Sequence, residues 1–318
     1  MHVFVTGGSG FLGQHLLRRL AEDGHRVRAL ARSTTARQRV TAAGATPVPG
    51  DLGSVTPDLL DGVDLVVHAA ADTRDWVRAG GLDATNVEGT RAVVVAARGA
   101  GVPRLVHVST EAVLADGRPI VSADEGVPLA GRPAGEYPRT KGLAERLVLG
   151  SDAPGFTTVA VRPRLIWGPG DTVVLPGVIA AAEAGRWSWV AGGHYLTSTC
   201  HVRNVCEGIV RAAEHGAGGS AYFLTDGEPV ELREFLTRSA AAHGVRLPDR
   251  SMPYAVARAL ATGLDATWRA LPLPGAPPLS RTAFALLLHE VTVDDSRARR
   301  ELGYLPVISR EEGLAALG

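Results

Sequence analysis

A glycine-rich segment near the start of the chain constrains the fold more than any other feature. An apolar, β-branched run at residues 3–6 is typical of a buried strand, and residues 7–13 then repeat glycine at every third position before a run of helical length and period. Glycines at such a turn let a backbone approach a pyrophosphate, and the helix N-terminus that follows offers N–H groups and a positive dipole end. The segment therefore predicts a dinucleotide site. Its expected cofactor-contacting residues are Gly7, Gly10, Phe11, Leu12 and Gly13.

The first half of the chain alternates strand-like and helix-like runs. Expected strands lie at residues 3–6, 26–31, 65–68, 105–109 and 157–161, and expected helices at 11–22, 35–43, 83–99 and 137–149. Strands that are apolar throughout, with helices between them, indicate a parallel sheet covered on both faces. The predicted fold class is α/β: a Rossmann doubly wound parallel sheet in a nucleotide-binding domain at 1–167, with a smaller C-terminal α/β substrate lobe at 168–318 that is interleaved with the end of the sheet.

The composition excludes several classes of protein. Lys+Arg and Asp+Glu are balanced at 33 each, so no nucleic-acid partner is expected. The two cysteines, Cys200 and Cys206, have no metal-binding spacing, so neither a metal site nor a disulfide framework is expected. No apolar run is long enough for an integral membrane segment, and residues 2–5 read as a strand rather than a signal peptide. These features predict a cytoplasmic protein that acts on a small molecule.

A tyrosine and a lysine four residues apart form the candidate reacting pair. Tyr137 and Lys141 fall in the run 137–149, and on a helix this spacing puts both side chains on one face. A phenol with a pKa near 10 is a poor proton shuttle at neutral pH, and a nearby ammonium should lower that pKa. The pair predicts acid–base chemistry beside the nucleotide.

Further segments resemble the extended short-chain dehydrogenases/reductases, and most closely their 3β-hydroxysteroid dehydrogenase-like branch. The segments that carry the resemblance are 50–52, 67–71, 86–90, 161–163, 166–171 and 297–306. The resemblance implies further cofactor contacts from Asp51, Leu52, Ala69, Ala70, Ala71 and Pro163, together with Tyr137 and Lys141. It also implies a homodimer joined through a four-helix interface.

The same resemblance assigns a catalytic hydroxyl and a substrate pocket. Thr110 follows the predicted fifth strand and takes the place of the family's catalytic Ser or Thr, with Ser109 as the alternative because a register error of one residue exchanges the two faces of a strand. The expected catalytic group is Thr110, Tyr137 and Lys141. The expected substrate-binding residues are Trp76, Leu114, Arg164, Trp167 and Tyr195, with Trp187 and Trp189 as further pocket candidates.

Arg32 favours NADP(H) over NAD(H). NAD-using relatives carry Asp at the end of the second strand, where this chain has Ala31 followed by Arg32 and Ser33. An acid there would repel a 2′-phosphate and a base would attract it. The alternative is that Arg32 is a solvated residue at a strand end. Arg37 and Arg39 are secondary candidates for the phosphate.

Three functions agree with these residues. The favoured one is an NADPH-dependent ketoreductase, or secondary-alcohol dehydrogenase, for a bulky and largely apolar substrate of steroid or polyketide type. The second is a nucleotide-sugar epimerase or dehydratase, although dehydratases resemble Thr-Asp-Glu where this chain has Thr110-Glu111-Ala112 and so lacks the second acid. The third, a non-catalytic NADP-binding protein, is disfavoured because the Thr, Tyr and Lys are all present.

Overall fold

A seven-stranded parallel sheet organises the molecule. The computed structural model describes residues 1–317. In spatial order the strands are β3 (Thr46–Pro49), β2 (Arg26–Ala31), β1 (His2–Thr6), β4 (Leu65–His68), β5 (Arg104–Val108), β7 (Thr157–Pro163) and β12 (Ser220–Leu224). All neighbouring pairs are parallel. The strand order reverses at β1, which makes the sheet doubly wound and confirms the predicted α/β class.

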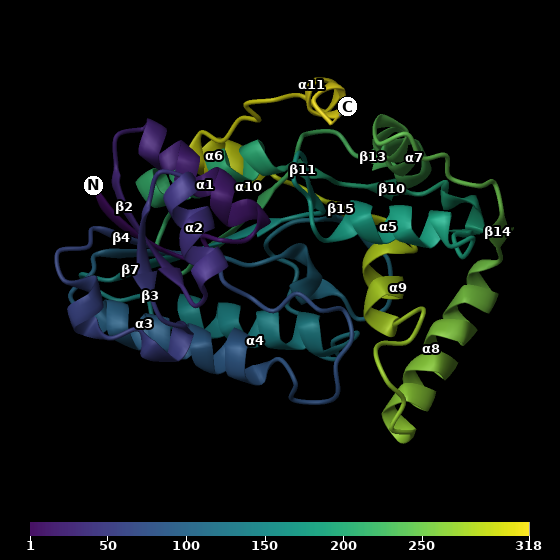
Figure 1. Cartoon of the computed structure of the whole chain (residues 1–318), viewed down its shortest axis with the longest axis horizontal. Coiled ribbons are helices and arrows are strands. Elements are labelled where there is room, and N and C mark those ends of the chain that lie inside the picture. The colour runs from purple at the N-terminus through teal and green to yellow at the C-terminus, as the bar shows by residue number, and fades with distance from the viewer. Residues whose placement is uncertain (318) are drawn as a thin grey trace.

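Helices cover both faces of this sheet, as the apolar strands require (Figure 1). One face carries α1 (Phe11–Glu22), α2 (Thr34–Ala42), α6 (Val202–His215) and α10 (Ser296–Leu302). The other carries α3 (Gly89–Gly99) and α4 (Glu136–Leu149). A π-helical turn at Ala84–Glu88 leads into α3, within the predicted helix at 83–99.

The remaining elements form the smaller lobe. A four-stranded sheet has the order β13 (Val230–Glu231), β10 (Leu196–Thr197), β15 (Val291–Val293) and β6 (Ile120–Ala123). Two short pairs add β8 (Ile166–Trp167) with β11 (Cys200–His201), and β9 (Trp189–Val190) with β14 (Ser251–Met252). The lobe's helices are α5 (Val174–Glu183), α7 (Leu232–Ala242), α8 (Tyr254–Ala270), α9 (Arg281–Leu287) and α11 (Arg310–Ala315). In Figure 1, α8 lies at the opposite end of the molecule from α1 and α3.

The chain crosses the boundary predicted at residue 167 in both directions. β6 comes before that boundary but pairs with β15 in the smaller sheet. α6, β12 and α10 come after it but belong to the layers of the main sheet. Among residues 1–317, no helix has both the length and the apolar character needed to cross a membrane.

Four short helical turns follow or precede strands. They are η1 (Leu52–Ser54), η2 (Pro57–Leu60), η4 (Glu111–Leu114) and η5 (Ala191–Gly193). Of these, η1 follows β3 and η4 follows β5, both at the carboxyl edge of the main sheet. In doubly wound sheets this edge is where ligands bind, next to the point of reversal.

Candidate active site

The glycine-rich turn forms a close-packed cradle at the carboxyl end of β1. Gly7 has a φ of +76°, and a Cβ on it would lie 2.7 Å from the backbone nitrogen of Ala70. A Cβ on Gly13 would lie 2.1 Å from the carbonyl oxygen of Gly7. Gly10 caps α1 without a side-chain hydrogen bond, and the first turn of α1 has no acidic residue. The turn therefore fits a pyrophosphate that approaches the backbone and the positive end of the helix.

A buried hydrogen-bond chain holds the neighbouring turn after β4. Thr90 Oγ1 donates to the carbonyl of Asn86 at 2.7 Å, so it accepts from His68 Nε2 at 2.8 Å. His68 Nδ1 is then the acceptor for the Thr6 hydroxyl at 2.7 Å, and Thr6 Oγ1 in turn accepts from the N–H of Ala70 at 3.2 Å. Burial lowers the pKa of His68 to about 3, which keeps the imidazole neutral as this pattern requires.

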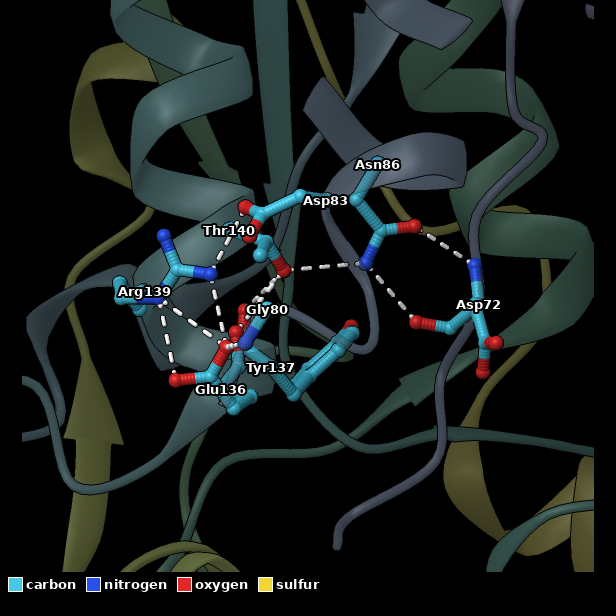
Figure 2. Close-up of polar contacts among 8 residues, drawn as sticks. All are labelled: Asp72, Gly80, Asp83, Asn86, Glu136, Tyr137, Arg139 and Thr140. Carbon is cyan, nitrogen blue, oxygen red and sulfur yellow. Dashed lines mark hydrogen bonds and ion pairs between the residues drawn. The ribbon is translucent and has the colours of Figure 1, made fainter. Parts of the chain in front are cut away.

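Asn86 and the first turn of α4 fasten the loop that follows (Figure 2). The Asn86 side chain pairs with the backbone of Asp72 at 2.7 and 2.9 Å and donates to Thr140 Oγ1 at 3.1 Å. Glu136 accepts from the N–H of Gly80 and pairs with Arg139. The loop at 69–83 is thus tied directly to the helix that carries Tyr137 and Lys141.

Lys141 is buried and its ammonium faces the end of β5. Nζ donates to the carbonyl of Val108 at 2.7 Å and lies 3.3 Å from Nε2 of His107, whose ring stacks on His68. Burial lowers the pKa of Lys141 to about 8, and nearby Glu145 opposes this shift. Burial also lowers the pKa of His107, and the ammonium beside it adds to that shift.

Tyr137 differs from the electrostatic expectation. Burial raises its pKa, the charge of Glu111 raises it further, and contact with the Thr110 hydroxyl lowers it. The hydrogen bonds of the Lys141 ammonium go to His107 and to the carbonyl of Val108 at the end of β5. The structure therefore raises the pKa of Tyr137, where the sequence predicted that it would fall.

Thr110 lies two residues after the end of β5 and is hydrogen-bonded to its neighbour Glu111. The Thr110 hydroxyl donates to Glu111 Oε2 at 2.8 Å and accepts from the N–H of Ala112 at 3.2 Å. Glu111 Oε1 forms a buried ion pair with Arg164 at 2.8 Å. The alternative hydroxyl, Ser109 Oγ, is buried and has no hydrogen-bond partner among residues 1–317.

The other predicted cofactor residues lie along the same edge of the sheet. Arg32 is exposed and follows β2, while Asp51 follows β3 and caps η1 through Ser54. Leu52 packs against Gly89, and Pro163 is the last residue of β7. All of these residues lie at the carboxyl ends of strands of the main sheet, whose order reverses at β1. In doubly wound sheets an extended ligand binds along this edge.

The predicted substrate-binding residues do not form one exposed surface. Trp167 is buried, donates to Asp226 Oδ2 at 2.7 Å and packs edge-on against Phe235. Leu114 is buried in the cluster around β6 and β15. Tyr195 donates to the carbonyl of Leu287 at 3.0 Å. Trp76 is partly buried, and its Nε1 has no partner among the described residues.

Trp187 is also partly buried and packs edge-on against Trp189, which is buried. Arg164 is buried in its pair with Glu111, and it also donates to Thr197 Oγ1 at 3.1 Å and to the carbonyl of Leu286 at 2.6 Å. Its charge is therefore already matched within the protein.

Sequence reasoning missed Glu111, His107 and Asn86 as parts of this site. Two signals were available for them. Glu111 directly follows Thr110, and His68 and His107 occupy the same register on adjacent strands. The contacts of Asn86 had no such signal, because Asp72 and Thr140 approach it from a loop and a separate helix.

The parallel sheet, the glycine cradle and the Tyr–Lys pair define a class, the NAD(P)-dependent oxidoreductases of the extended short-chain dehydrogenase/reductase type. Residues 4–254 match the 3-beta hydroxysteroid dehydrogenase/isomerase family. The chain belongs to this family.

Two relatives cover the full length of the chain. It is 51% identical over 319 residues to the 4-hydroxy-2-methyl-3-oxo-4-farnesyl-3,4-dihydroquinoline-1-oxide ketoreductase of Stigmatella aurantiaca, covering 100% of this chain and 96% of the relative. It is 36% identical to a 2-alkyl-3-oxoalkanoate reductase of Stenotrophomonas maltophilia (strain K279a), covering 100% and 98%. Among solved structures, MoeE5 in complex with UDP-glucuronic acid and NAD is similar with a TM-score of 0.74 and 25% identity, covering 99% of this chain and 97% of that one.

Proposed function

We propose that this protein is an NADPH-dependent ketoreductase that reduces a bulky, largely apolar ketone, or oxidises the matching secondary alcohol. The arrangement of Tyr137 beside Thr110 carries the proposal, because it supplies a protonated phenol and a second hydroxyl at the carboxyl edge of the nucleotide-binding sheet. Both full-length relatives are named for the reduction of a ketone, in one case on a ring that carries a farnesyl chain.

Each residue has a defined task in this proposal. A bound NADPH supplies the hydride. Tyr137 donates its proton to the carbonyl oxygen, and Thr110 supplies a second hydroxyl beside the phenol. Lys141, fixed to the end of β5, places a positive charge near the phenolate that forms and contributes a hydrogen-bond donor to the nicotinamide ribose.

The buried ion pair of Arg164 disfavours a nucleotide-sugar substrate. A diphosphate would need unpaired cations in the substrate lobe. Arg164, the cation predicted for the pocket, is buried and paired with Glu111. The similarity to MoeE5, which was solved with UDP-glucuronic acid, keeps nucleotide-sugar chemistry as the second candidate.

We assign the preference for NADPH to Arg32. Its side chain is exposed at the end of β2. After Arg74, the charge of Arg32 also helps to lower the pKa of Asp72, so Arg32 lies near the turn after β4. An exposed guanidinium between these two turns is suited to a 2′-phosphate.

Cofactor stoichiometry tests the proposed reaction. A ketoreductase oxidises one NADPH for each alcohol formed, whereas an epimerase or dehydratase shows no net change in nicotinamide absorbance. We expect farnesylated or long-chain alkyl ketones to be reduced with this stoichiometry. Tyr137→Phe should bind NADPH normally and lose this activity, which shows that the signal comes from the site. Turnover of a UDP-sugar without net NADPH oxidation, together with inert ketones, would replace the proposal with the epimerase alternative.

A further inference from the structure

Glu111 has no role in the proposed chemistry, yet it is buried directly beside it. One carboxylate oxygen accepts from the Thr110 hydroxyl at 2.8 Å, and the other pairs with Arg164 at 2.8 Å. Both charged side chains are almost fully excluded from solvent. Burying such a pair costs several kcal/mol of desolvation, about as much as the ion pair returns, so stability alone gives little reason for it.

The hydrogen bonds decide how the Thr110 hydroxyl is oriented. A hydroxyl has one proton and two lone pairs. The proton of Thr110 goes to Glu111, and one lone pair accepts from the N–H of Ala112. One lone pair remains, and η4, which Thr110 caps, packs against α4, the helix that carries Tyr137. Glu111 and Ala112 therefore fix the orientation of the Thr110 hydroxyl beside this helix.

Arg164 fixes the carboxylate from behind and connects it to the smaller lobe. Its guanidinium also donates to Thr197 Oγ1 and to the carbonyl of Leu286 at the end of α9. The start of α9 approaches α4 closely, since a Cβ on Gly135 would lie 1.9 Å from Thr282 Oγ1. The Glu111 carboxylate is thus attached to the main sheet through η4. It is attached to the smaller lobe through Arg164, which contacts Thr197 and Leu286.

We propose that Glu111 is a positioning residue that acts through Thr110: held by Arg164, it takes the Thr110 proton and fixes the orientation of that hydroxyl beside Tyr137. This inference rests on the proposed roles of Thr110 and Tyr137 in ketone reduction. Glu111 itself touches neither substrate nor cofactor. Its loss should lower kcat while the KM values for ketone and NADPH change little.

A double-mutant cycle on the full-length enzyme tests this route. Thr110→Val should lower kcat about 100-fold, in the range for loss of one preorganised hydrogen-bonding group. Glu111→Gln alone should lower kcat about 10-fold to 100-fold, with both KM values within about threefold of wild type. In the Thr110→Val background, Glu111→Gln should have no further effect on kcat, because the group through which it acts is already absent.

The controls separate positioning from a general loss of stability. Asp295→Asn breaks a similar arrangement that has no contact with Thr110 or Glu111, in which Thr225 donates to a carboxylate that pairs with Arg299, and should leave kcat unchanged. If Glu111→Gln does not fold, Glu111→Gln with Arg164→Met removes both buried charges and should show the same kcat loss. NADPH titration and thermal melting establish that each variant is folded.

Three results would overturn the inference. Equal losses from Glu111→Gln in the wild-type and Thr110→Val backgrounds would show that Glu111 does not act through Thr110. Wild-type kcat in Glu111→Gln, with Thr110→Val impaired, would reject Glu111 alone and leave the proposed function intact. Wild-type kcat in Thr110→Val would reject the role of Thr110 and with it any role of Glu111 through that residue.

Discussion

The ammonium of Lys141 is buried and held by hydrogen bonds at the end of β5, which makes its charge sensitive to pH. Burial lowers its pKa from 10.5 to about 8. Its positive charge is needed when Tyr137 becomes a phenolate, so activity is present below this pKa and is lost as pH rises through it. We expect kcat/KM for ketone reduction to fall above about pH 8, since this parameter reports the free enzyme.

Stability should move in the opposite direction over the same range. Between pH 8 and 10.5, the unfolded chain holds the Lys141 proton more tightly than the folded one, so this group's contribution to the free energy of unfolding rises with pH. Loss of activity at pH 9 without loss of the folded state, measured by circular dichroism, is therefore expected. A flat kcat/KM profile from pH 7 to 10 would contradict the assignment of Lys141.

Arg32 should set the cofactor preference at the end of β2. Arg32→Ala removes an exposed cation, and charge-assisted contacts to phosphate are worth about 1.5–3 kcal/mol, so KM for NADPH should rise about tenfold to a hundredfold. KM for NADH should change little. Arg26→Ala, at the opposite end of β2, is the matched control. Equal effects of Arg32→Ala on both cofactors would remove Arg32 from the phosphate site.

At the scale of elements, the contact between β1, its turn and α1 depends on Gly13. Gly13→Ala would put a methyl group 2.1 Å from the Gly7 carbonyl oxygen, and neither backbone segment can yield cheaply. We expect a loss of about 1–3 kcal/mol in the free energy of unfolding and weaker NADPH binding, measured by denaturant titration and fluorescence. Gly263→Ala, in α8 with open space around it, should instead be neutral or stabilising by up to about 1 kcal/mol. Equal effects of the two substitutions would show that the turn tolerates a side chain.

Elements also show where sequence reasoning was sufficient. The helix α1 has the predicted bounds, because amphipathic periodicity and the flanking glycines are local signals. β12 was not recognised as a strand of the main sheet, although Ala221 to Leu224 is apolar. β12 comes after α6 in the chain and pairs with β7 at the edge of the main sheet. Such a pairing is decided by packing between segments that are far apart in the sequence.

For the whole molecule, cofactor binding should stabilise the fold, because its predicted contacts come from the turns after β1, β2, β3 and β4, from the last residue of β7 and from α4. At 100 times its dissociation constant, a ligand that binds only the native state adds about 2.7 kcal/mol. We expect NADPH to raise Tm by several degrees in wild type. Arg32→Ala should need a higher NADPH concentration for the same shift, while Tyr137→Phe should match wild type. An NADPH-independent Tm would contradict cofactor binding at this edge.

The sequence by itself determined the sheet class, the glycine cradle and the helical Tyr137–Lys141 pair, because these depend on residues close together in the chain. The tertiary structure decided which charged groups of the site are paired and in which direction their pKa values shift. Arg164 looked like a pocket cation, but Glu111 reaches it across 53 positions and neutralises it. Lys141 was expected to lower the pKa of Tyr137, but burial and the charge of Glu111 raise that pKa. Charge and hydrogen bonding depend on distances between atoms, and only packing of the sheet against the smaller lobe fixes those distances.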